Sequence, residues 1–245
     1  MQRGFFVSGV GAQMTQTRLS DIAHNMANVN TAGYLASQTS FSTIMVRNMQ
    51  TQQGQLPAAY LTLDKQYMDT KEGLIRQTGN DLDFAIEGNG YFRVRAADGQ
   101  EALTRAGNFR LDGDGNLLTQ NGLQVLDSNG QPINLPAGKL TASTDGALSV
   151  NGNPVSQLGI VSLKDPTLIT QLGDSMFRTP ESNKGAADPK ATLQEGVLEG
   201  SNVNAILEMT KMIDAMRSNQ SMLKVVEQYN QQAGLLIDRV GVVQG

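Results

Sequence analysis

The 245-residue chain contains one histidine, no cysteine and no tryptophan, and only 17% of its residues are charged. Without cysteine it has no thiol nucleophile, no disulfide and no thiolate metal site, and a single histidine cannot build a histidine metal cluster. The formal net charge of -4 gives no electrostatic reason to bind nucleic acid or an anionic membrane. We therefore expect no cofactor, no metal and no nucleic-acid partner, and the composition is unusual for an enzyme of this size.

The N-terminal residues 1–10 carry one arginine and a short apolar patch. A secretory signal peptide needs an apolar core of about 7–15 residues followed by small residues at a cleavage site, and neither is present. No stretch approaches the roughly 20 apolar residues of a membrane-spanning helix. We expect a soluble protein that does not insert into a membrane and does not leave the cell by the general secretory route. A dedicated export route without cleavage would leave no such mark.

Residues 1–33 have the periodicity of an amphipathic helix. Apolar residues recur every seven positions from Phe5 through Ala12, and further apolar residues follow at a spacing of three. The opposite face is polar, and Gly33 is suitably placed to end the helix as a C-terminal cap. The pattern predicts a narrow packing stripe that needs a partner helix. Its residues with a predicted packing role are Leu19, Ile22, Met26 and Val29.

Residues 196–245 contain a second heptad pattern, without proline after Ser201. It predicts a long C-terminal helix that pairs with the N-terminal one, with Ser201 or Asn202 as its N-cap. Asn219 and Asn230 interrupt the apolar positions, either as imperfect patterning or as buried polar residues that set register and partner number. The predicted packing residues of this helix are Met209, Met212, Met216, Leu223, Val226 and Ile237.

Between the two helices the pattern is that of β structure. Residues 73–195 contain many Asp-Gly and Asn-Gly pairs separated by short alternating runs, which is typical of hairpins in an antiparallel β domain. Residues 34–72 are rich in Gln, Thr and Ser and suggest an extended arm or a loose hairpin. The predicted fold class is α+β, with terminal helices paired as a coiled coil around an inserted antiparallel β domain of many short strands.

Few residues point to chemistry. The segment 112–116 begins like a calcium loop, but Leu117 and Leu123 stand where an EF-hand needs glycine and glutamate, so we interpret it as a hairpin turn. Acidic residues occur in pairs, and His24 lies beside the first packing stripe, yet nothing in the sequence groups them around a cleft. The acidic pairs are Asp81 with Asp83 and Glu195 with Glu199. We expect no catalytic residue among them.

Three segments together resemble the flagellar axial proteins that build rod and hook. The first runs from Ser8 to Tyr34 and ends in Ala-Asn-Val-Asn-Thr-Ala-Gly-Tyr. The second joins Thr78–Phe92 to Leu103-Thr-Arg-Ala-Gly-Asn-Phe109, and the third is Gly196-Val-Leu-Glu-Gly-Ser-Asn-Val-Asn204. They occur in the order and at the spacing of that family and cover the chain from end to end.

The resemblance implies a structural subunit of the flagellar basal-body rod. In such a rod the paired terminal helices line an inner tube, and the β domain lies outside it. It also implies, as partners, further copies of the chain, other rod proteins, a rod cap with muramidase activity and the flagellar type III export apparatus. The segment Arg217-Ser-Asn-Gln220 differs from the Arg-Ala-Tyr-Glu of distal-rod proteins, and a Gly-rich insertion is lacking. Both features favour the proximal rod.

Two alternatives remain open at this point. One is a distal-rod or hook subunit of the same family, although the chain is short for a hook subunit. The other is a β-domain binding module whose terminal helices only oligomerise it. Such a module would carry aromatic or titratable residues on one β face, whereas the β region holds few aromatic residues and no histidine.

Overall fold

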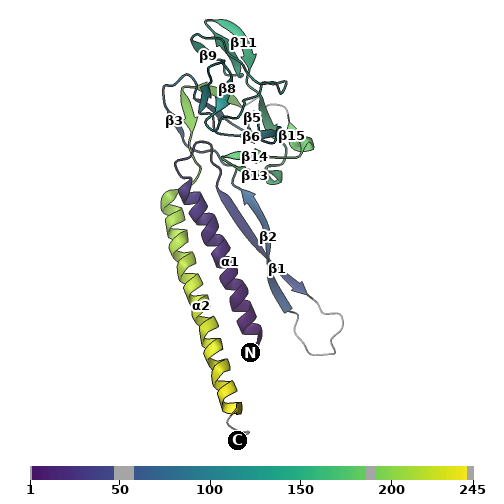
Figure 1. The fold of residues 1–245 in the computed structure, drawn as a ribbon, viewed down its shortest axis with the longest axis vertical. Helices are drawn as coiled ribbons and strands as arrows, with labels where there is room; N and C mark the ends of the chain where they lie inside the picture. The colour runs from purple at the N-terminus through teal and green to yellow at the C-terminus, as the bar shows by residue number, and fades with distance from the viewer. Residues whose placement is uncertain (1, 47–57, 186–190, 242–245) are drawn as a thin grey trace. The chain divides into compact units, whose positions relative to one another are not determined.

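The computed structural model describes residues 2–46, 58–185 and 191–241, and the side chains of residues 9–40, 67–185 and 191–231. Contacts divide the chain into two compact units. The helical unit contains residues 1–26, 37–66 and 204–245, and the β unit contains residues 27–36 and 67–203. Helices and strands in this arrangement confirm the predicted α+β class (Figure 1).

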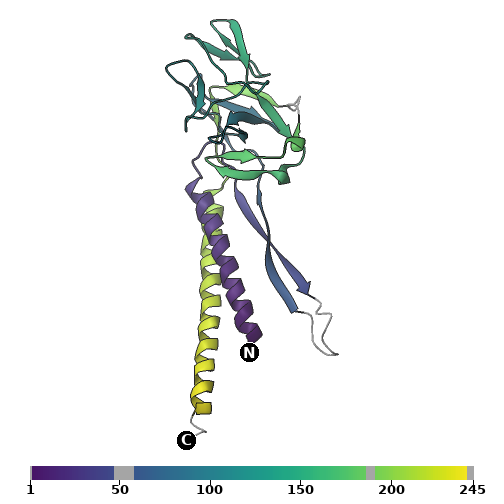
Figure 2. The same cartoon turned by 45° about the vertical axis from the view of Figure 1, so that its right-hand side comes forward.

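The helical unit consists of α1 (Gln2–Ala27), α2 (Ala205–Gly241) and a two-stranded sheet of β1 (Ser37–Val46) and β2 (Ala58–Met68). Figures 1 and 2 show α1 and α2 side by side and running in opposite directions. Asn25 ties α1 to β1, since its side-chain amide donates to the Ser37 carbonyl and accepts from the Ser37 N–H, each at 2.9 Å. The Asp21 carboxylate accepts a hydrogen bond from the Thr39 hydroxyl.

Both predicted helix boundaries need correction. The helix α1 ends at Ala27 and not at Gly33, because residues 28–33 form turns before the chain enters the β unit. The N-cap of α2 is Asn204, whose side-chain oxygen accepts from the backbone N–H groups of Ile206 and Leu207 at 3.1 Å. Neither Ser201 nor Asn202 caps the helix.

The β unit contains a six-stranded sheet in the order β13-β14-β6-β5-β12-β15, and its neighbouring strands run antiparallel. Four smaller sheets lie around it, namely β11-β10-β9, β16-β4, β17-β3 and β7-β8. The central strands are β5 (Tyr91–Arg95) and β6 (Glu101–Thr104), flanked by β12 (Ile160–Leu163), β14 (Met176–Arg178), β13 (Thr170–Gly173) and β15 (Lys184–Gly185). The smaller sheets comprise β3 (Ile75–Gln77), β4 (Phe84–Glu87), β7 (Phe109–Leu111), β8 (Leu117–Thr119), β9 (Leu140–Ala142), β10 (Ala147–Val150), β11 (Asn153–Gln157), β16 (Thr192–Glu195) and β17 (Val197–Glu199). Two short 3-10 helices, Pro166–Leu168 and Glu181–Asn183, lie between the later strands.

The main core of the β unit includes a closed ring of backbone hydrogen bonds. The N–H of Val125 donates to the carbonyl of Leu117, that of Ile133 to Val125, and that of Leu117 to Ile133, at 2.9 to 3.0 Å. All three side chains are fully buried. Their eight-residue spacing follows from tight turns between them, at one of which Asp127 accepts a backbone N–H bond. Asp112 accepts in the same way at the turn that precedes Leu117. The segment 112–116 is therefore a hairpin turn, as predicted.

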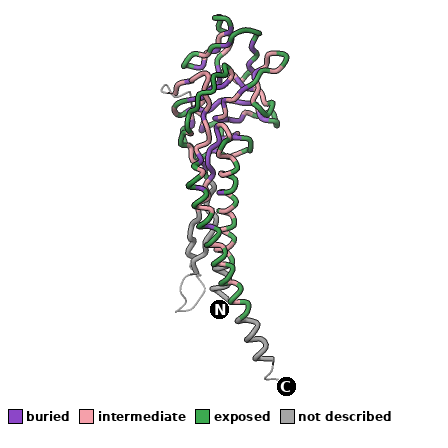
Figure 3. Tube along the Cα trace, turned by 90° about the vertical axis from the view of Figure 1, so that its left-hand side faces the viewer, coloured by how far each residue is buried: buried purple, intermediate pink, exposed green. Residues whose placement is uncertain are grey.

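Burial is distributed unevenly between the units. Figure 3 shows buried positions gathered in the β unit and exposed positions along α2. Three phenylalanines anchor the main core, with Phe92 edge-on to Phe109 at 5.2 Å between ring centroids and Phe84 6.1 Å from Phe109. The β unit thus has a core of its own, whereas the helical unit leaves large apolar side chains in contact with solvent.

Leu117→Ala should lower the free energy of unfolding by about 2–5 kcal/mol, because it removes a fully buried side chain from the ring. Leu111→Ala in the same hairpin is the matched control, since Leu111 is 38% exposed. Urea unfolding followed by circular dichroism measures both. Equal losses in the free energy of unfolding for the two variants would contradict the packing of Leu117 in the core.

Candidate functional site

The chain passes between the helical unit and the β unit at four places. Three segments of the β unit, residues 27–36, 67–74 and 196–203, lead into or out of these passages and meet one another. We call them the junction. The Gly33 N–H donates to the Glu199 carbonyl at 2.9 Å, and the Asp69 N–H donates to the Ala36 carbonyl at 2.8 Å. Segments far apart in sequence are therefore joined directly at the junction.

Asn202 bonds to both of the other junction segments. Its side-chain oxygen accepts from the Ala36 N–H at 2.7 Å, while its amide nitrogen donates to the carbonyls of Asp69 and Lys71 at 2.7 and 3.0 Å. Its own backbone N–H donates to the Tyr34 carbonyl. An aspartate would lose the two donated bonds, and an alanine would lose all three side-chain bonds. Asparagine is thus specifically suited to this position.

A buried ion pair lies against the same junction. Arg105 and Glu199 are 3% and 2% exposed, and their charged groups approach to 3.3 Å. The guanidinium also donates to the carbonyls of Ile86 and Gly88 and lies 4.8 Å from the ring centroid of Tyr91. The second carboxylate oxygen of Glu199 accepts from the Gly73 N–H at 2.9 Å. The pair therefore connects β17 to the strands and turns around β4 and β5.

The electrostatics of the pair are dominated by loss of water. Burial raises the pKa of the Glu199 carboxyl above its ordinary value, and the opposing attraction of Arg105 does not cancel that effect. Burial likewise raises the pKa of the neighbouring Tyr91 hydroxyl. Arg105 and Glu199 are enclosed and bonded to each other and to backbone groups, which suits a structural contact and not proton transfer to a substrate.

Close packing at the junction requires glycine. Gly33 has φ +61°, and a Cβ there would lie 2.1 Å from the Ala106 backbone nitrogen. A Cβ on Gly73 would lie 2.1 Å from the Gly200 carbonyl oxygen. Such distances are far below van der Waals contact, so any side chain at either position would force the segments apart.

Acidic residues of the pairs noted in the sequence accept hydrogen bonds within the β unit. Glu195 accepts from the Ala142 N–H at 2.7 Å, and Asp83 accepts from the Asn80 side chain at 3.1 Å. Glu199 is held by Arg105, as described above. All three carboxylates therefore act as hydrogen-bond acceptors within the β unit. Among the described residues no group of histidine, cysteine and acidic side chains could hold a metal ion.

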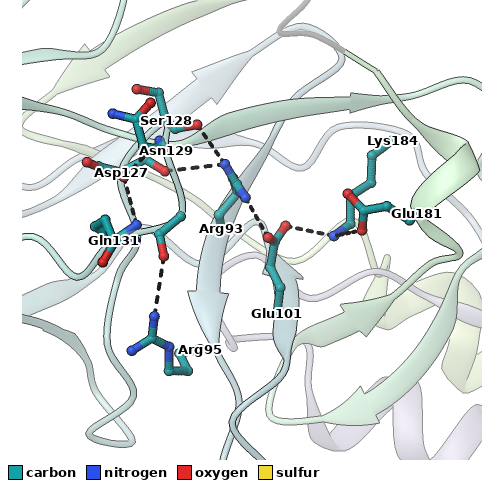
Figure 4. Close-up of polar contacts among 10 residues, drawn as sticks. Arg93, Arg95, Glu101, Asp127, Ser128, Asn129, Gln131, Glu181 and Lys184 are labelled. Carbon is teal, nitrogen blue, oxygen red and sulfur yellow. Dashed lines mark hydrogen bonds and ion pairs between the residues drawn. The ribbon is translucent and has the colours of Figure 1, made fainter.

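A second polar cluster lies on the six-stranded sheet (Figure 4). Glu101 accepts from Arg93 at 2.6 Å and from Lys184 at 2.9 Å, and Lys184 also pairs with Glu181. Arg93 donates in addition to the Ser128 carbonyl at 2.8 Å. The cluster thus fastens two central strands to the edge strand β15 and to the turn after Leu126. Every charged group in it has an opposite charge or a carbonyl as its partner, which again indicates a structural role.

In the helical unit α1 and α2 contact each other directly. The Asn219 side-chain amide donates to the Ala12 carbonyl and the Thr15 hydroxyl, both at 3.4 Å. A Cβ on Gly11 would lie 3.2 Å from the sulfur of Met222, so the helices approach closely there. Along α2 the buried or half-buried residues at alternating spacings of four and three are Glu208, Met212, Ala215, Asn219, Met222, Val226 and Tyr229. We call this the inner stripe.

A second stripe on α2 is apolar and exposed. It has the same heptad spacing as the inner stripe but a different phase. Its large apolar side chains are between 48% and 79% exposed in the single chain, an unusual number for one helix face. They are Ile206, Met209, Ile213, Met216 and Leu223. We call this the outer stripe.

The predicted packing residues divide between these surfaces. Met212 and Val226 lie on the inner stripe, whereas Met209, Met216 and Leu223 lie on the outer stripe. On α1, Ile22 is buried, Leu19 and Met26 are half-buried, and Val29 packs beside Tyr34 in the β unit. The side chain of Ile237 lies outside the described residues, as does that of Phe5.

No sequence pattern pointed to the ion pair of Arg105 and Glu199, and Asn202 was predicted only as a helix cap, although all three lie in the segments that carry the family resemblance. Gly33 and Gly73 offered one usable signal, because isolated glycines beside apolar residues often mark close backbone approach. The pairing of residues 94 positions apart could not be read from periodicity.

Comparisons with known proteins place this architecture among the flagellar axial proteins. A family model described as the flagellar hook protein FlgE/F/G D1 domain matches residues 85–162. A second model, the C-terminal region of the flagellar basal body rod FlgEFG proteins, matches residues 194–238. The first match covers the ring and the central strands β5 and β6 of the six-stranded sheet, and the second covers β17, part of the junction and nearly all of α2.

Individual relatives are similar over nearly their whole length. The flagellar basal-body rod protein FlgF of Caulobacter vibrioides is 31% identical over 238 residues, which cover 96% of this chain and 97% of the relative. The FlgG rod protein of Agrobacterium fabrum is 32% identical, covering 96% and 98% of the two chains. FlgF of Escherichia coli is 30% identical, with 96% of each chain covered.

The chain therefore belongs to the family of flagellar basal-body rod proteins. It is a structural subunit of the rod and is located in the flagellar basal body. In the part of the chain that the structure describes, no helix is sufficiently long and apolar to cross a membrane.

Gly33→Ala should destabilise the protein far more than Gly79→Ala. Both glycines have a positive φ, but a Cβ on Gly79 meets nothing within 4 Å, so that variant measures backbone strain alone, about 1 kcal/mol. At Gly33 the strain is joined by a collision with the Ala106 backbone, and we expect a further loss of about 3 kcal/mol or more. Urea unfolding measures the difference, and similar losses would refute the close approach.

Glu101→Gln should make the stability less sensitive to acid. Burial acts to raise the pKa of Glu101, but the hydrogen bonds and charges of Arg93 and Lys184 outweigh it and hold the pKa below its ordinary 4.5. Because the folded pKa is lowered, the stabilisation is present above the unfolded pKa and is lost as pH falls through the folded pKa. Unfolding midpoints in urea from pH 7 to about pH 3 should therefore fall more steeply for wild type than for the variant. The exposed helix variant Glu227→Gln should follow wild type, and an unchanged slope in Glu101→Gln would contradict the assignment.

Proposed function

We propose that the protein is a non-enzymatic rod subunit that polymerises through α2. The inner stripe pairs with α1 of the same chain in the manner of a coiled coil, and the outer stripe packs against helices of neighbouring subunits. The observation that carries this proposal is the presence of two heptad stripes on one helix, of which one is in contact with α1 and the other is apolar and exposed.

The outer stripe supplies a driving force for assembly. Removing a large apolar side chain from water stabilises a complex by about 1.5–3 kcal/mol when burial is complete. Five such side chains on one face give ample free energy to offset the entropy lost when a subunit joins a polymer. Met209 and Met216 suit a surface that meets more than one neighbour, because the unbranched side chain adapts its shape. Ile237 would extend packing toward the end of α2.

The inner stripe supplies register. Asn219 is half-buried and donates toward Ala12 and Thr15 of α1, so a shift of one helix along the other would leave its amide without partners. Leu19, Ile22 and Met26 continue from Thr15 at heptad spacing and extend this α1 face toward the C-terminal end of α1. This favours the second interpretation of the polar position, in which asparagine selects one alignment at some cost in stability.

The partners follow from membership of the rod family. We propose that the chain contacts further copies of itself and other rod proteins, with the rod cap that has muramidase activity and the flagellar type III export apparatus as additional partners. The relatives named FlgF and the segment Arg217-Ser-Asn-Gln220 favour the proximal rod over the distal rod. No feature of the described β unit favours the alternative of a ligand-binding module with oligomerising ends.

Met216→Asp and Leu223→Asp should abolish rod assembly while leaving the single chain folded. Both side chains are half exposed in the free chain, so each substitution should change its stability by no more than about 0.5 kcal/mol. In the polymer an unpaired aspartate would be buried, which costs several kcal/mol at every subunit. The measurements are urea unfolding of the purified protein and a count of rods in basal bodies from cells that carry only the variant.

Ser221→Asp is the matched control, because Ser221 is exposed on α2 and belongs to neither stripe. It should assemble as wild type does. Normal rod numbers with Met216→Asp, or equal losses with Ser221→Asp, would contradict packing through the outer stripe.

A further inference from the structure

Hydrogen bonding at the junction depends mainly on its last segment. The two earlier segments, residues 27–36 and 67–74, present backbone groups whose partners come from residues 199–202. The Ala36 N–H, the Asp69 carbonyl and the Lys71 carbonyl are bound by the Asn202 side chain. The Gly33 and Gly73 N–H groups are bound by Glu199, and the Leu74 carbonyl accepts from the Gly200 N–H. Removing residues 199–202 would leave each of these groups without that bond.

The buried charge of Arg105 also depends on this last segment for its partner. Arg105 is almost fully buried, and its Nε has no hydrogen-bond partner within the described structure. Its remaining contacts are the carbonyls of Ile86 and Gly88, the Tyr91 ring and the carboxylate of Glu199. Glu199 is therefore its one anionic partner among the residues described. Before Glu199 is in place, the Arg105 guanidinium would have no anionic partner. It would then have to stay hydrated, so its surroundings could not close around it.

The partners of the early segments come late in the chain. Asn202 lies 166 positions after Ala36, and Glu199 lies 94 positions after Arg105. A chain made from its N-terminus contains α1, the β1–β2 hairpin and the central sheet before it contains the residues that close the junction. Nearly all residues of the ring and of the main core precede Glu199 by many positions. The β unit can thus form its core while the junction remains open.

We propose that residues 199–202 are a closing latch, by which the exits to α1 and to the β1–β2 hairpin become fixed only when the C-terminal part of the chain has docked. Arg105, Glu199 and Asn202 are the positioning residues of the latch. The proposal rests on the proposed function, in which the helices assemble the rod, and adds a condition to it. A subunit with an open latch keeps a folded β core but does not enter the polymer.

Glu199→Gln tests the latch in the full-length protein. The amide oxygen still accepts from Gly73, but Arg105 loses its anionic partner. We expect hydrogen exchange of the Gly33, Ala36 and Gly73 amides to become at least about tenfold faster, because these amides are released when the latch opens. The ring amides of residues 117, 125 and 133 should exchange at the wild-type rate, which separates latch opening from global unfolding.

Two further variants control for charge removal and test rescue. Asp98→Asn removes an exposed ion pair, since the side chains of Asp98 and Arg178 are 48% and 34% exposed. It should leave the exchange rates of the junction amides and of the ring amides unchanged. Arg105→Gln combined with Glu199→Gln leaves no unpaired charge and should restore much of the junction protection lost in Glu199→Gln. If Glu199→Gln acted only by changing side-chain volume or by unfolding the protein, the second substitution would not restore the protection.

Assembly is then counted in basal bodies from cells that carry each variant. Glu199→Gln should give few rods and the double variant more, whereas Met216→Asp should give none with its junction amides still protected. The last result separates failure of helix packing from failure of the latch. Unchanged junction exchange in Glu199→Gln, an equal rise at the ring amides, or wild-type rod numbers with an open junction would each overturn the latch.

Discussion

The contact between Arg105 and Glu199 is the constraint around which the rest of the junction is arranged. A buried ion pair adds little net stability, because the free energy of removing two charges from water offsets their attraction. Breaking it is costly, however, since the remaining charge stays buried. The pair therefore selects one arrangement of the surrounding segments. Gly33 and Gly73 make that arrangement sterically possible, and Asn202 satisfies the backbone groups that it buries.

The general architecture could be predicted because it depends on short-range patterns. Heptad spacing identified α1 and α2, and Asp-Gly and Asn-Gly pairs identified the hairpins of the β unit. The helix ends were misplaced for a physical reason. Gly33 has the positive φ of a helix cap but uses it to approach Ala106, and Asn202 has a capping side chain that bonds to the other junction segments. In both cases a tertiary contact uses a residue whose local preference points to a helix terminus.

The assembly surfaces were only partly predictable. A heptad pattern shows which residues share a face, but α2 has two such faces side by side, and the predicted set combined Met212 and Val226 from one with Met216 and Leu223 from the other. Their separation became visible only when the position of α1 showed which stripe it contacts. The junction was less accessible still, because single residues such as Arg105 and Glu199 pair across most of the β unit without any periodicity.

The two units divide the requirements of a polymer subunit between them. The β unit buries its apolar residues within one chain, around the ring of Leu117, Val125 and Ile133. The helical unit leaves its outer stripe exposed, and in the proposed function this stripe is covered by neighbouring subunits. A subunit built in this way can fold its β core without burying the outer stripe of α2. The junction is then the natural place to control assembly, because it is the only part of the β unit through which the chain runs to α1, to the β1–β2 hairpin and to α2.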